Sequence, residues 1–236
     1  MNELEEKILS ETFEEDFGFV CVQVIKNIGT SIPGAHVHGP YQVACMNMFP
    51  KRINDDINFL IDKKVSFIRD FDIKNPEHLK VKDYGTMILA VPYFMKRPLE
   101  AIIYPKDFSV QWLRDLSKEQ RLDLAKVTSD VSYALSLLMP ARGNVFDYNF
   151  VFHTGPIGTM YIEIFPSSQR PGGFERVGLY VCQGIPVNSA EIYRRCFEIY
   201  MQEHPGKRFN LEPSQVVIDE IKKEIIDYVV NLGCKK

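Results

Sequence analysis

Residues 117–140 read SKEQRLDLAKVTSDVSYALSLLMP and contain the strongest helix signal in the chain. Ser117 is followed three residues later by Gln120, which is a capping-box sequence and predicts the start of a helix. Apolar residues then recur every three or four positions, so they line one face of that helix. They are Leu124, Val127, Val131, Leu135 and Leu138. Pro140, with Gly143 just beyond it, predicts the helix end.

Segments rich in β-branched and aromatic residues lie on both sides of this helix and predict strands. The predicted strands cover residues 17–26, 42–49, 79–84, 86–94, 99–105, 146–153, 160–166 and 175–183. The 3–4 spacing of apolar residues predicts further helices at 53–67, 189–202 and 213–232. Strands and helices in this order favour an α+β fold built on an antiparallel sheet.

Bulk properties exclude several classes of protein. The chain has 236 residues, a net charge of −3 and a sequence pI of about 6.0, which disfavour a general nucleic-acid or membrane-surface binder. No apolar run approaches the roughly 20 residues of a spanning helix. The acidic start lacks the order of a secretory signal, and the five scattered cysteines favour reduced thiols. We therefore expect a cytoplasmic protein without nucleic-acid or membrane partners.

The sharpest chemical feature is the segment 31–42, SIPGAHVHGPYQ. His36 and His38 are two residues apart, so on an extended chain both rings lie on one face. Such a pair can be a solvated loop feature, two ligands of a metal, or a nucleophile with a partner that orients it. A neutral imidazole can attack phosphorus at physiological pH. The glycines beside it would let backbone amides approach phosphate oxygens.

The wider segment 27–50, NIGTSIPGAHVHGPYQVACMNMFP, resembles the active-site region of galactose-1-phosphate uridylyltransferases, in the histidine-triad superfamily. Asn27, Gly29, His36, His38, Gly39, Gln42 and Pro50 occur in the matching order. The resemblance continues through 91–108, the 117–140 helix and 148–175, and it covers about residues 17–200. It implies a histidine-triad-like (HIT-like) fold, an antiparallel sheet with a long packing helix. The expected units are a partial one at 1–70 and a complete one with a helical tail at 71–236.

The resemblance also implies a reaction. His38 would be the nucleophile that takes a nucleoside monophosphate from a nucleotide sugar and passes it to a sugar 1-phosphate. His36 and Gln42 would complete the catalytic set, and Gln42 would help to hold the transferred phosphoryl group. Asn27, Gly39 and Glu175 would contact the substrate, Glu175 at the sugar. Lys96, Arg97 and Arg170 are candidate phosphate contacts because cations pair with phosphate oxygens.

No cofactor is required by this chemistry, but the resemblance implies a possible divalent metal site, holding Fe or Zn. Its ligands here would be Asp56, His153 and Glu163, with Tyr161 and Glu163 standing where the family has histidines. The chain departs from the family at the catalytic motif too. Pro40 and Tyr41 are inserted before Gln42, and the cysteines of the family's structural zinc site have no counterpart upstream of Phe17.

Two other functions stay open. The first is a phosphorylase or hydrolase of nucleotide sugars or dinucleoside polyphosphates, in which phosphate or water replaces the sugar phosphate. The second is a non-catalytic binder of nucleotides or sugar phosphates. A homodimer is also expected, because an incomplete first unit leaves a sheet edge open and open edges become covered. The apolar residues of 213–232 could cover that edge or form the interface.

Overall fold

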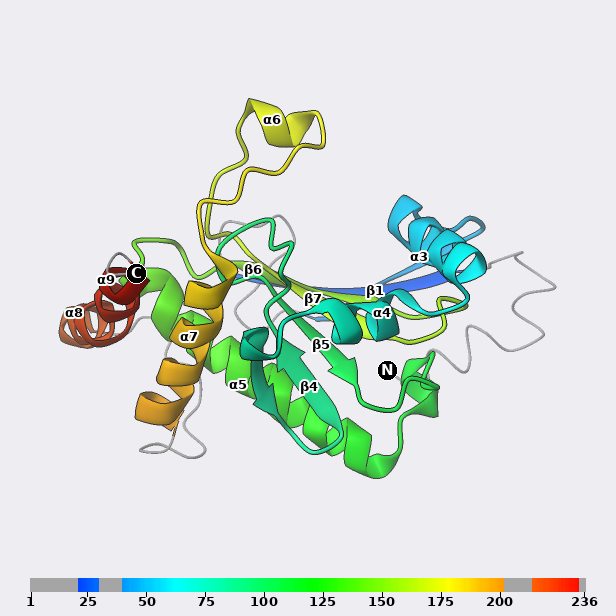
Figure 1. Ribbon diagram of the computed structural model, residues 1–236, viewed down its shortest axis with the longest axis horizontal. Coiled ribbons are helices and arrows are strands. Elements are labelled where there is room, and N and C mark those ends of the chain that lie inside the picture. The colour runs from blue at the N-terminus through cyan, green and yellow to red at the C-terminus, as the bar shows by residue number, and fades with distance from the viewer. Residues whose placement is uncertain (1–20, 30–39, 202–213, 234–236) are drawn as a thin grey trace.

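The computed structural model describes residues 21–29, 40–201 and 214–233, which form one sheet with helices on both faces (Figure 1). The strands are β1 (Cys21–Ile28), β2 (Gln42–Met46), β3 (Lys80–Asp83), β4 (Met87–Ala90), β5 (Ala101–Pro105), β6 (Tyr148–His153) and β7 (Tyr161–Pro166). The α-helices are α3 (Lys51–Lys63), α4 (Phe67–Lys74), α5 (Lys118–Ala141), α6 (Gly173–Arg176), α7 (Pro186–Cys196), α8 (Gln215–Ile221) and α9 (Tyr228–Gly233).

The sheet order is β2-β1-β6-β7-β5-β4-β3, and every neighbouring pair is antiparallel. The predicted α+β fold with an antiparallel sheet is therefore confirmed. Strand β1 pairs with β2 on one side and with β6 on the other, from Val24 opposite Phe152 to Ile28 opposite Tyr148. The sheet thus runs without a break from the predicted 1–70 unit into the 71–236 unit.

The long helix α5 covers one face of the sheet and holds the main core. Ser117 caps it: the Ser117 hydroxyl accepts from the Gln120 amide, and the Gln120 side chain accepts from the Ser117 amide at 2.7 Å. The predicted helix is confirmed, although Pro140 lies inside its last turn. Alternate residues of β6 and β7 point to this core because side chains alternate across a strand. The core contains Phe150, Phe152, Ile162, Ile164, Val127, Val131, Leu135 and Leu138.

Helices α3 and α4 cover part of the opposite face over a second, smaller core. Ile53 of α3 and Ile68 and Phe71 of α4 pack there with Ile102, Tyr104 and Tyr161 of the sheet. The single helix predicted at 53–67 is wrong. Lys64 adopts a left-handed conformation (φ 58°) that ends α3, and Ser66 then caps α4 with its hydroxyl.

The strand predicted at 175–183 is also wrong. These residues lie in an arm, residues 167–185, which carries α6 and projects away from the sheet (Figure 1). Val177, Leu179 and Val181 are exposed there, and none of them pairs with a described strand. High β propensity does not make a strand without a neighbour to pair with.

The C-terminal helices form a third group of elements. Helix α8, the π-helical turn at Lys222–Asp227 and α9 follow one another, which confirms a helical segment within 213–232. Ile221, Ile225, Ile226 and Val229 enter the main core, and α8 lies against α5. This segment therefore packs on the main core beside α5. No helix of the described residues is long and apolar enough to cross a membrane.

Helix α7 runs along the other edge of the sheet, against β3. Arg194 of α7 donates from Nη1 to the backbone carbonyls of His78 (2.9 Å) and Lys80 (3.2 Å). The same guanidinium pairs with Glu191 at 2.9 Å, which holds it in place. The carbonyl groups at the start of β3 are thus bonded to a side chain.

Candidate functional site

The two ends of the predicted catalytic segment are fixed by a row of side-chain amides. Asn27 near the end of β1 donates to Gln42 at the start of β2, with 3.1 Å between Nδ2 and Oε1. Asn149 of β6 donates to Asn27 Oδ1 at 2.6 Å. His36, His38 and Gly39 lie between these ends in the sequence, outside the described residues. The insertion of Pro40 and Tyr41 still allows Gln42 to join this amide row.

Gly29, directly after β1, has no room for a side chain. Its backbone adopts a φ of 131°, and a Cβ atom there would lie 2.8 Å from Asp147 Cα and 2.7 Å from Asp147 Cγ. Only glycine adopts such a conformation readily and also allows this close approach. Gly29 therefore fixes the direction in which the chain leaves β1 towards the histidines.

A cavity of about 380 Å³ lies beside the amide row, within the range of small-molecule sites. It brings together three of the predicted substrate residues, Asn27, Lys96 and Arg97, from two distant parts of the chain. Its lining residues are Ile25, Asn27, Lys96, Arg97, Asn149, Val151, Phe165 and Tyr180. The cavity thus offers two cations, two amides and two aromatic rings to a ligand.

The cations of the cavity lie over aromatic rings. Lys96 Nζ is 5.9 Å from the centre of the Phe165 ring and 5.5 Å from that of Tyr180, and the Arg97 guanidinium is 5.3 Å from Phe165. Such contacts orient a cation and leave its N–H groups available to an anion. The arrangement therefore suits a ligand that carries both a phosphate group and a flat ring.

A strained turn presents these two cations. Leu99 is fully buried and adopts a left-handed conformation (φ 64°), which costs a non-glycine residue roughly 1–2 kcal/mol. Its amide donates to Ser189 Oγ at 3.2 Å, and its carbonyl accepts from the Tyr193 hydroxyl at 2.8 Å. The Ser168 hydroxyl donates to the Pro98 carbonyl at 2.6 Å. Three side chains thus hold the turn that carries Lys96 and Arg97.

Glu100 directly follows Leu99 in the chain and is fully buried. Its Oε2 accepts from the Lys96 amide at 2.9 Å, while Oε1 has no hydrogen-bond partner among the described residues. Burial raises the pKa of this carboxyl, and the Glu163 charge raises it further, against the opposing effect of Lys96 and Arg97. The hydrogen bond from the Lys96 amide to Glu100 thus stabilises the turn, whereas the burial of the charged carboxylate is unfavourable.

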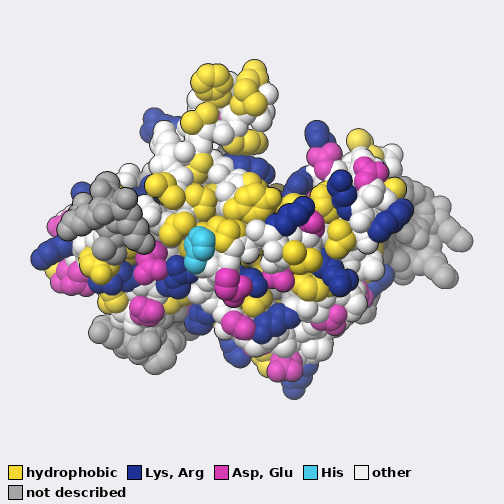
Figure 2. Space-filling view, viewed as in Figure 1, with side chains coloured by type: hydrophobic (Ala, Val, Ile, Leu, Met, Phe, Trp, Pro, Cys, Tyr) yellow, Lys and Arg dark blue, Asp and Glu magenta, His cyan; other side chains and the backbone are white. Residues whose placement is uncertain are grey.

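The predicted contacts Glu175 and Arg170 lie on the arm and do not line the cavity. Both Glu175 oxygens bond within the arm, to the amides of Gly172 (2.7 Å) and Val181 (3.1 Å), and these bonds lower its pKa. Tyr180 connects the arm to the cavity. Figure 2 shows hydrophobic side chains gathered at the end of the arm. Phe174, Val177 and Leu179 of the arm are exposed.

The predicted metal ligands Asp56, His153 and Glu163 lie close together under α3, and the Arg52 side chain contacts two of them. Arg52 reaches Asp56 with one terminal nitrogen and Glu163 with the other, at 3.7 Å each. The Tyr161 hydroxyl donates to Asp56 at 2.6 Å, and the His153 ring stacks on the Tyr161 ring at 4.3 Å. His153 Nε2 is 2.8 Å from Glu163 Oε2, but the ring N–H direction does not fit a hydrogen bond.

The electrostatics of this buried cluster follow from its neighbours. Burial raises the pKa of Asp56 despite the opposing charge of Arg52. Burial also acts to raise the pKa of Glu163, but contact with His153 and the charge of Arg52 outweigh it and leave that pKa below its usual value. No group of three acidic, histidine or cysteine side chains in the described residues converges as a metal site. With Arg52 between the two carboxylates, these residues do not fit a bound metal.

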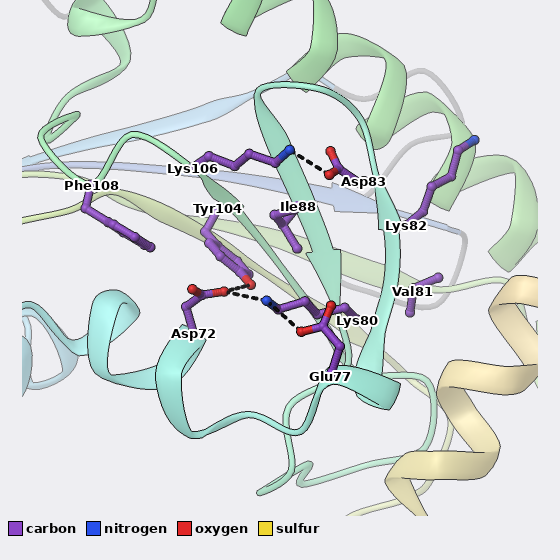
Figure 3. Close-up of a pocket in the computed structure, with 10 residues that line it drawn as sticks. All are labelled: Asp72, Glu77, Lys80, Val81, Lys82, Asp83, Ile88, Tyr104, Lys106 and Phe108. Atoms are coloured by element: carbon purple, nitrogen blue, oxygen red, sulfur yellow. Dashed lines mark hydrogen bonds and ion pairs between the residues drawn. The ribbon is translucent and has the colours of Figure 1, made fainter.

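A second cavity, of about 410 Å³, lies near β3 and holds none of the predicted site residues. Figure 3 shows two of its lysines paired within the cavity: Lys80 contacts Asp72 (3.1 Å) and Glu77 (3.0 Å), and Lys106 contacts Asp83 (2.6 Å). The third, Lys82, pairs with Asp130 at 3.1 Å. Because its cations already have carboxylate partners, this cavity is less suited to a phosphate group than the one with Lys96 and Arg97.

Sequence reasoning missed Asn149, Phe165 and Tyr180 in the cavity and Arg52 in the buried cluster. Asn149 carried a signal, since it is a polar residue within the apolar strand segment 146–153. Arg52 carried a weaker one, because it stands four residues before Asp56 on a helix, where side chains meet.

The fold is shared with several solved protein structures. The solved structure of a uridylyltransferase matches 84% of this chain and 66% of its own, with a TM-score of 0.70 and 19% identity. An ADP-glucose phosphorylase from Arabidopsis thaliana, solved with bound ADP-glucose, matches 82% of this chain and 63% of its own, with a TM-score of 0.64 and 20% identity. These likenesses establish the fold, an antiparallel sheet with a long helix.

The sequence itself shows a particular relationship. Over 135 residues, 56% of this chain, it is 30% identical to galactose-1-phosphate uridylyltransferase of Thermotoga maritima, and the match spans 40% of that protein. No protein-family model matches the chain. The chain is thus a distant relative of the galactose-1-phosphate uridylyltransferases, as the motif of residues 27–50 predicts.

The conformation of Gly29 leads to a mutational prediction. Gly29→Ala should destabilise the protein by about 2 kcal/mol or more, because a β-carbon meets Asp147 and the φ of 131° disfavours any side chain. Gly143→Ala is the control: its φ of 75° is also positive, but no atom lies within 4 Å of the added carbon. Urea unfolding measures both. Equal losses for the two variants would contradict the close contact with Asp147.

Glu100 leads to a prediction about pH. Its pKa is raised in the folded protein, so its contribution to stability falls as pH rises from the unfolded value, about 4.3, through the folded pKa. Glu100→Gln keeps an oxygen that accepts from Lys96 and removes the buried charge. The variant should therefore gain stability relative to wild type as pH rises from about 4 to 7. Urea unfolding across this range measures the free energy of unfolding of both proteins. If the difference between them did not change with pH, the raised pKa of Glu100 would be refuted.

Proposed function

We propose that this chain transfers a nucleoside monophosphate from a nucleotide sugar to a sugar 1-phosphate through a covalent intermediate on His38. The observation that carries the proposal is the cavity beside the two ends of the histidine segment. Lys96 and Arg97 line it together with Asn27, Phe165 and Tyr180. Two cations beside amides and rings suit a phosphate group attached to a nucleoside or sugar.

The reaction has two displacements. In the first, a His38 ring nitrogen attacks the phosphorus next to the nucleoside, a P–N bond forms, and the P–O bond to the departing sugar 1-phosphate breaks. In the second, a phosphate oxygen of another sugar 1-phosphate attacks the same phosphorus, and the P–N bond breaks. Each step exchanges one bond at phosphorus, so the nucleotide moves without hydrolysis.

The described residues have distinct roles in this scheme. Lys96 and Arg97 stabilise the negative charge on the phosphoryl oxygens, and Arg97 presents a planar fork of donors. Asn27 orients Gln42, which holds the transferred phosphoryl group with His36 nearby in sequence. Phe165 and Tyr180 provide flat surfaces for a ring. Gly39, Arg170 and Glu175 remain predicted contacts of the phosphate and sugar.

A second candidate is phosphorolysis, in which inorganic phosphate accepts the nucleotide from His38. It is favoured by the fold shared with ADP-glucose phosphorylase. The first displacement is the same in both reactions, so only the acceptor differs. A non-catalytic binder, by contrast, would occupy the cavity without forming the P–N bond.

The test is the intact mass of the protein after incubation with UDP-glucose, ADP-glucose or GDP-glucose. We expect wild type to gain one nucleoside monophosphate and His38→Ala to gain none. Lys96→Ala should form the adduct about 10- to 100-fold more slowly, because a charge-assisted bond to phosphate is lost. Lys106→Ala, in the second cavity, is the matched control and should react like wild type.

Adding glucose 1-phosphate, galactose 1-phosphate or inorganic phosphate to the isolated adduct then identifies the acceptor. Release of a nucleotide sugar supports transfer to a sugar phosphate, and release of a nucleoside diphosphate supports phosphorolysis. Binding of all three donors with no adduct on any of them would instead indicate a binder.

We further propose a homodimer that uses the arm. Phe174, Val177 and Leu179 are between 60% and 73% exposed on the arm, where water contact of large apolar groups is unfavourable. Sedimentation velocity at micromolar concentration should show a dimer for wild type and a monomer for Phe174→Ser combined with Leu179→Ser. Arg176→Ser, on the same helix, is the control. A wild-type monomer would remove this proposal.

A further inference from the structure

Both ends of the arm are fixed to the turn that carries Lys96 and Arg97. At one end the Ser168 hydroxyl donates to the Pro98 carbonyl at 2.6 Å. At the other end Gly184 packs so closely on Pro98 that an added β-carbon would lie 3.0 Å from the proline ring. The two ends of the arm and the two cations of the cavity therefore have a fixed relation to one another.

Packing does not fix the path of the arm between these ends. Every residue from 170 to 181 is exposed except Glu175, which is partly buried. None of these residues lies in a described strand, so no sheet ladder holds them. Side-chain hydrogen bonds cross between the two branches of the arm instead, and they come from Gln169 and Glu175.

These bonds meet at Val181, the residue after Tyr180. The Val181 amide donates to Glu175 Oε1 at 3.1 Å, and the Val181 carbonyl accepts from Gln169 Nε2 at 3.0 Å. The Gln169 side chain also accepts from the Gln183 amide at 3.0 Å. Backbone groups need such partners, which a paired strand would otherwise provide. The two side chains thus take the place of a neighbouring strand for this segment.

The position of the Tyr180 ring follows from the path of this segment. The ring lines the cavity, and Lys96 Nζ lies 5.5 Å from its centre. An aromatic ring can stack on the flat base of a nucleotide, whichever base it is. Tyr180 can do so only where the arm holds its ring at the cavity, and that part of the arm is held by Gln169 and Glu175.

We infer that Gln169 and Glu175 are positioning residues, which hold the Tyr180 ring at the cavity, where it stacks on the base of the nucleotide. Glu175 then acts through Tyr180 and does not touch the sugar, because both of its oxygens already accept from amides of the arm. This role differs from the sugar contact that the family resemblance implies. The inference rests on the proposed function, since it takes the cavity to be the nucleotide site.

The first experiment needs no ligand. Reductive methylation with ¹³C-formaldehyde gives every lysine of the full chain a labelled methyl signal, and Lys96→Arg identifies the one from Lys96. The neighbouring ring shifts this signal, so Tyr180→Ala should move it. Glu175→Ala and Gln169→Ala should move it in the same direction, because the ring is displaced. Arg176→Ala, next to Glu175 on α6, is the matched control and should leave the signal in place.

Calorimetric titration measures the effect on the ligand, with UMP, AMP, GMP and the corresponding glucose nucleotides as probes. For a base that binds wild type, Tyr180→Ala should weaken binding roughly 5- to 100-fold, as loss of one stacked ring does. Glu175→Ala should weaken the monophosphate and the glucose nucleotide equally, by about 3- to 10-fold, because arm hydrogen bonds are lost. Glu175→Gln keeps one acceptor oxygen and should lose less. In a Tyr180→Ala background, Glu175→Ala should have no further effect.

Three results would overturn the inference. One is a Lys96 signal that Tyr180→Ala moves and Glu175→Ala does not, since Glu175 would then not hold the ring. Another is a loss for Glu175→Ala with glucose nucleotides alone, which a sugar contact would produce. The third is an equal loss for Glu175→Ala with and without the Tyr180 ring. If wild type binds none of the probes, the proposed function and the stacking fail together, while the Lys96 signal still decides whether Glu175 holds Tyr180.

Discussion

The antiparallel pairing of β1 with β6 is the interaction on which the rest of the site depends. It places Asn27 opposite Asn149 and Ile25 opposite Val151, residues more than 120 positions apart in the chain. Because β6 also pairs with β7, the same rows continue to Phe165 and Glu163. A slip of β1 by one residue against β6 would turn Asn27 and Ile25 to the α5 face. The cavity and the buried cluster are therefore two regions of a single sheet face.

Much of the fold could be predicted from local patterns, and the failures have physical causes. The capping box and apolar face of α5 are complete within one segment, so the prediction of that helix is confirmed. The break between α3 and α4 depends on Lys64, which adopts a left-handed conformation. Sequence patterns predict this conformation mainly at glycine, so a lysine gives no sign of it. The segment 175–183 has strand-like composition, but pairing is a property of the whole sheet and could not be read from it.

The candidate site was likewise predicted only in part. Asn27, Lys96 and Arg97 have recognisable sequence signals and line one cavity. Phe165 and Tyr180 join them only through the sheet register and the path of the arm, which sequence spacing does not encode. Arg52 meets Asp56 within one helix, but its contact with Glu163 requires α3 to lie across β7. The pairing of Arg52 with both carboxylates thus depends on how α3 packs on the sheet, which local sequence does not predict.

The bonds from Arg194 to the carbonyls of His78 and Lys80 have a consequence for solubility during folding and storage. An unpaired strand edge can template growth of an intermolecular sheet, the first step towards fibrils. A guanidinium that already bonds the carbonyls of His78 and Lys80 removes acceptors that an incoming strand would need. Sheet growth from this side of the molecule is therefore disfavoured by a single side chain.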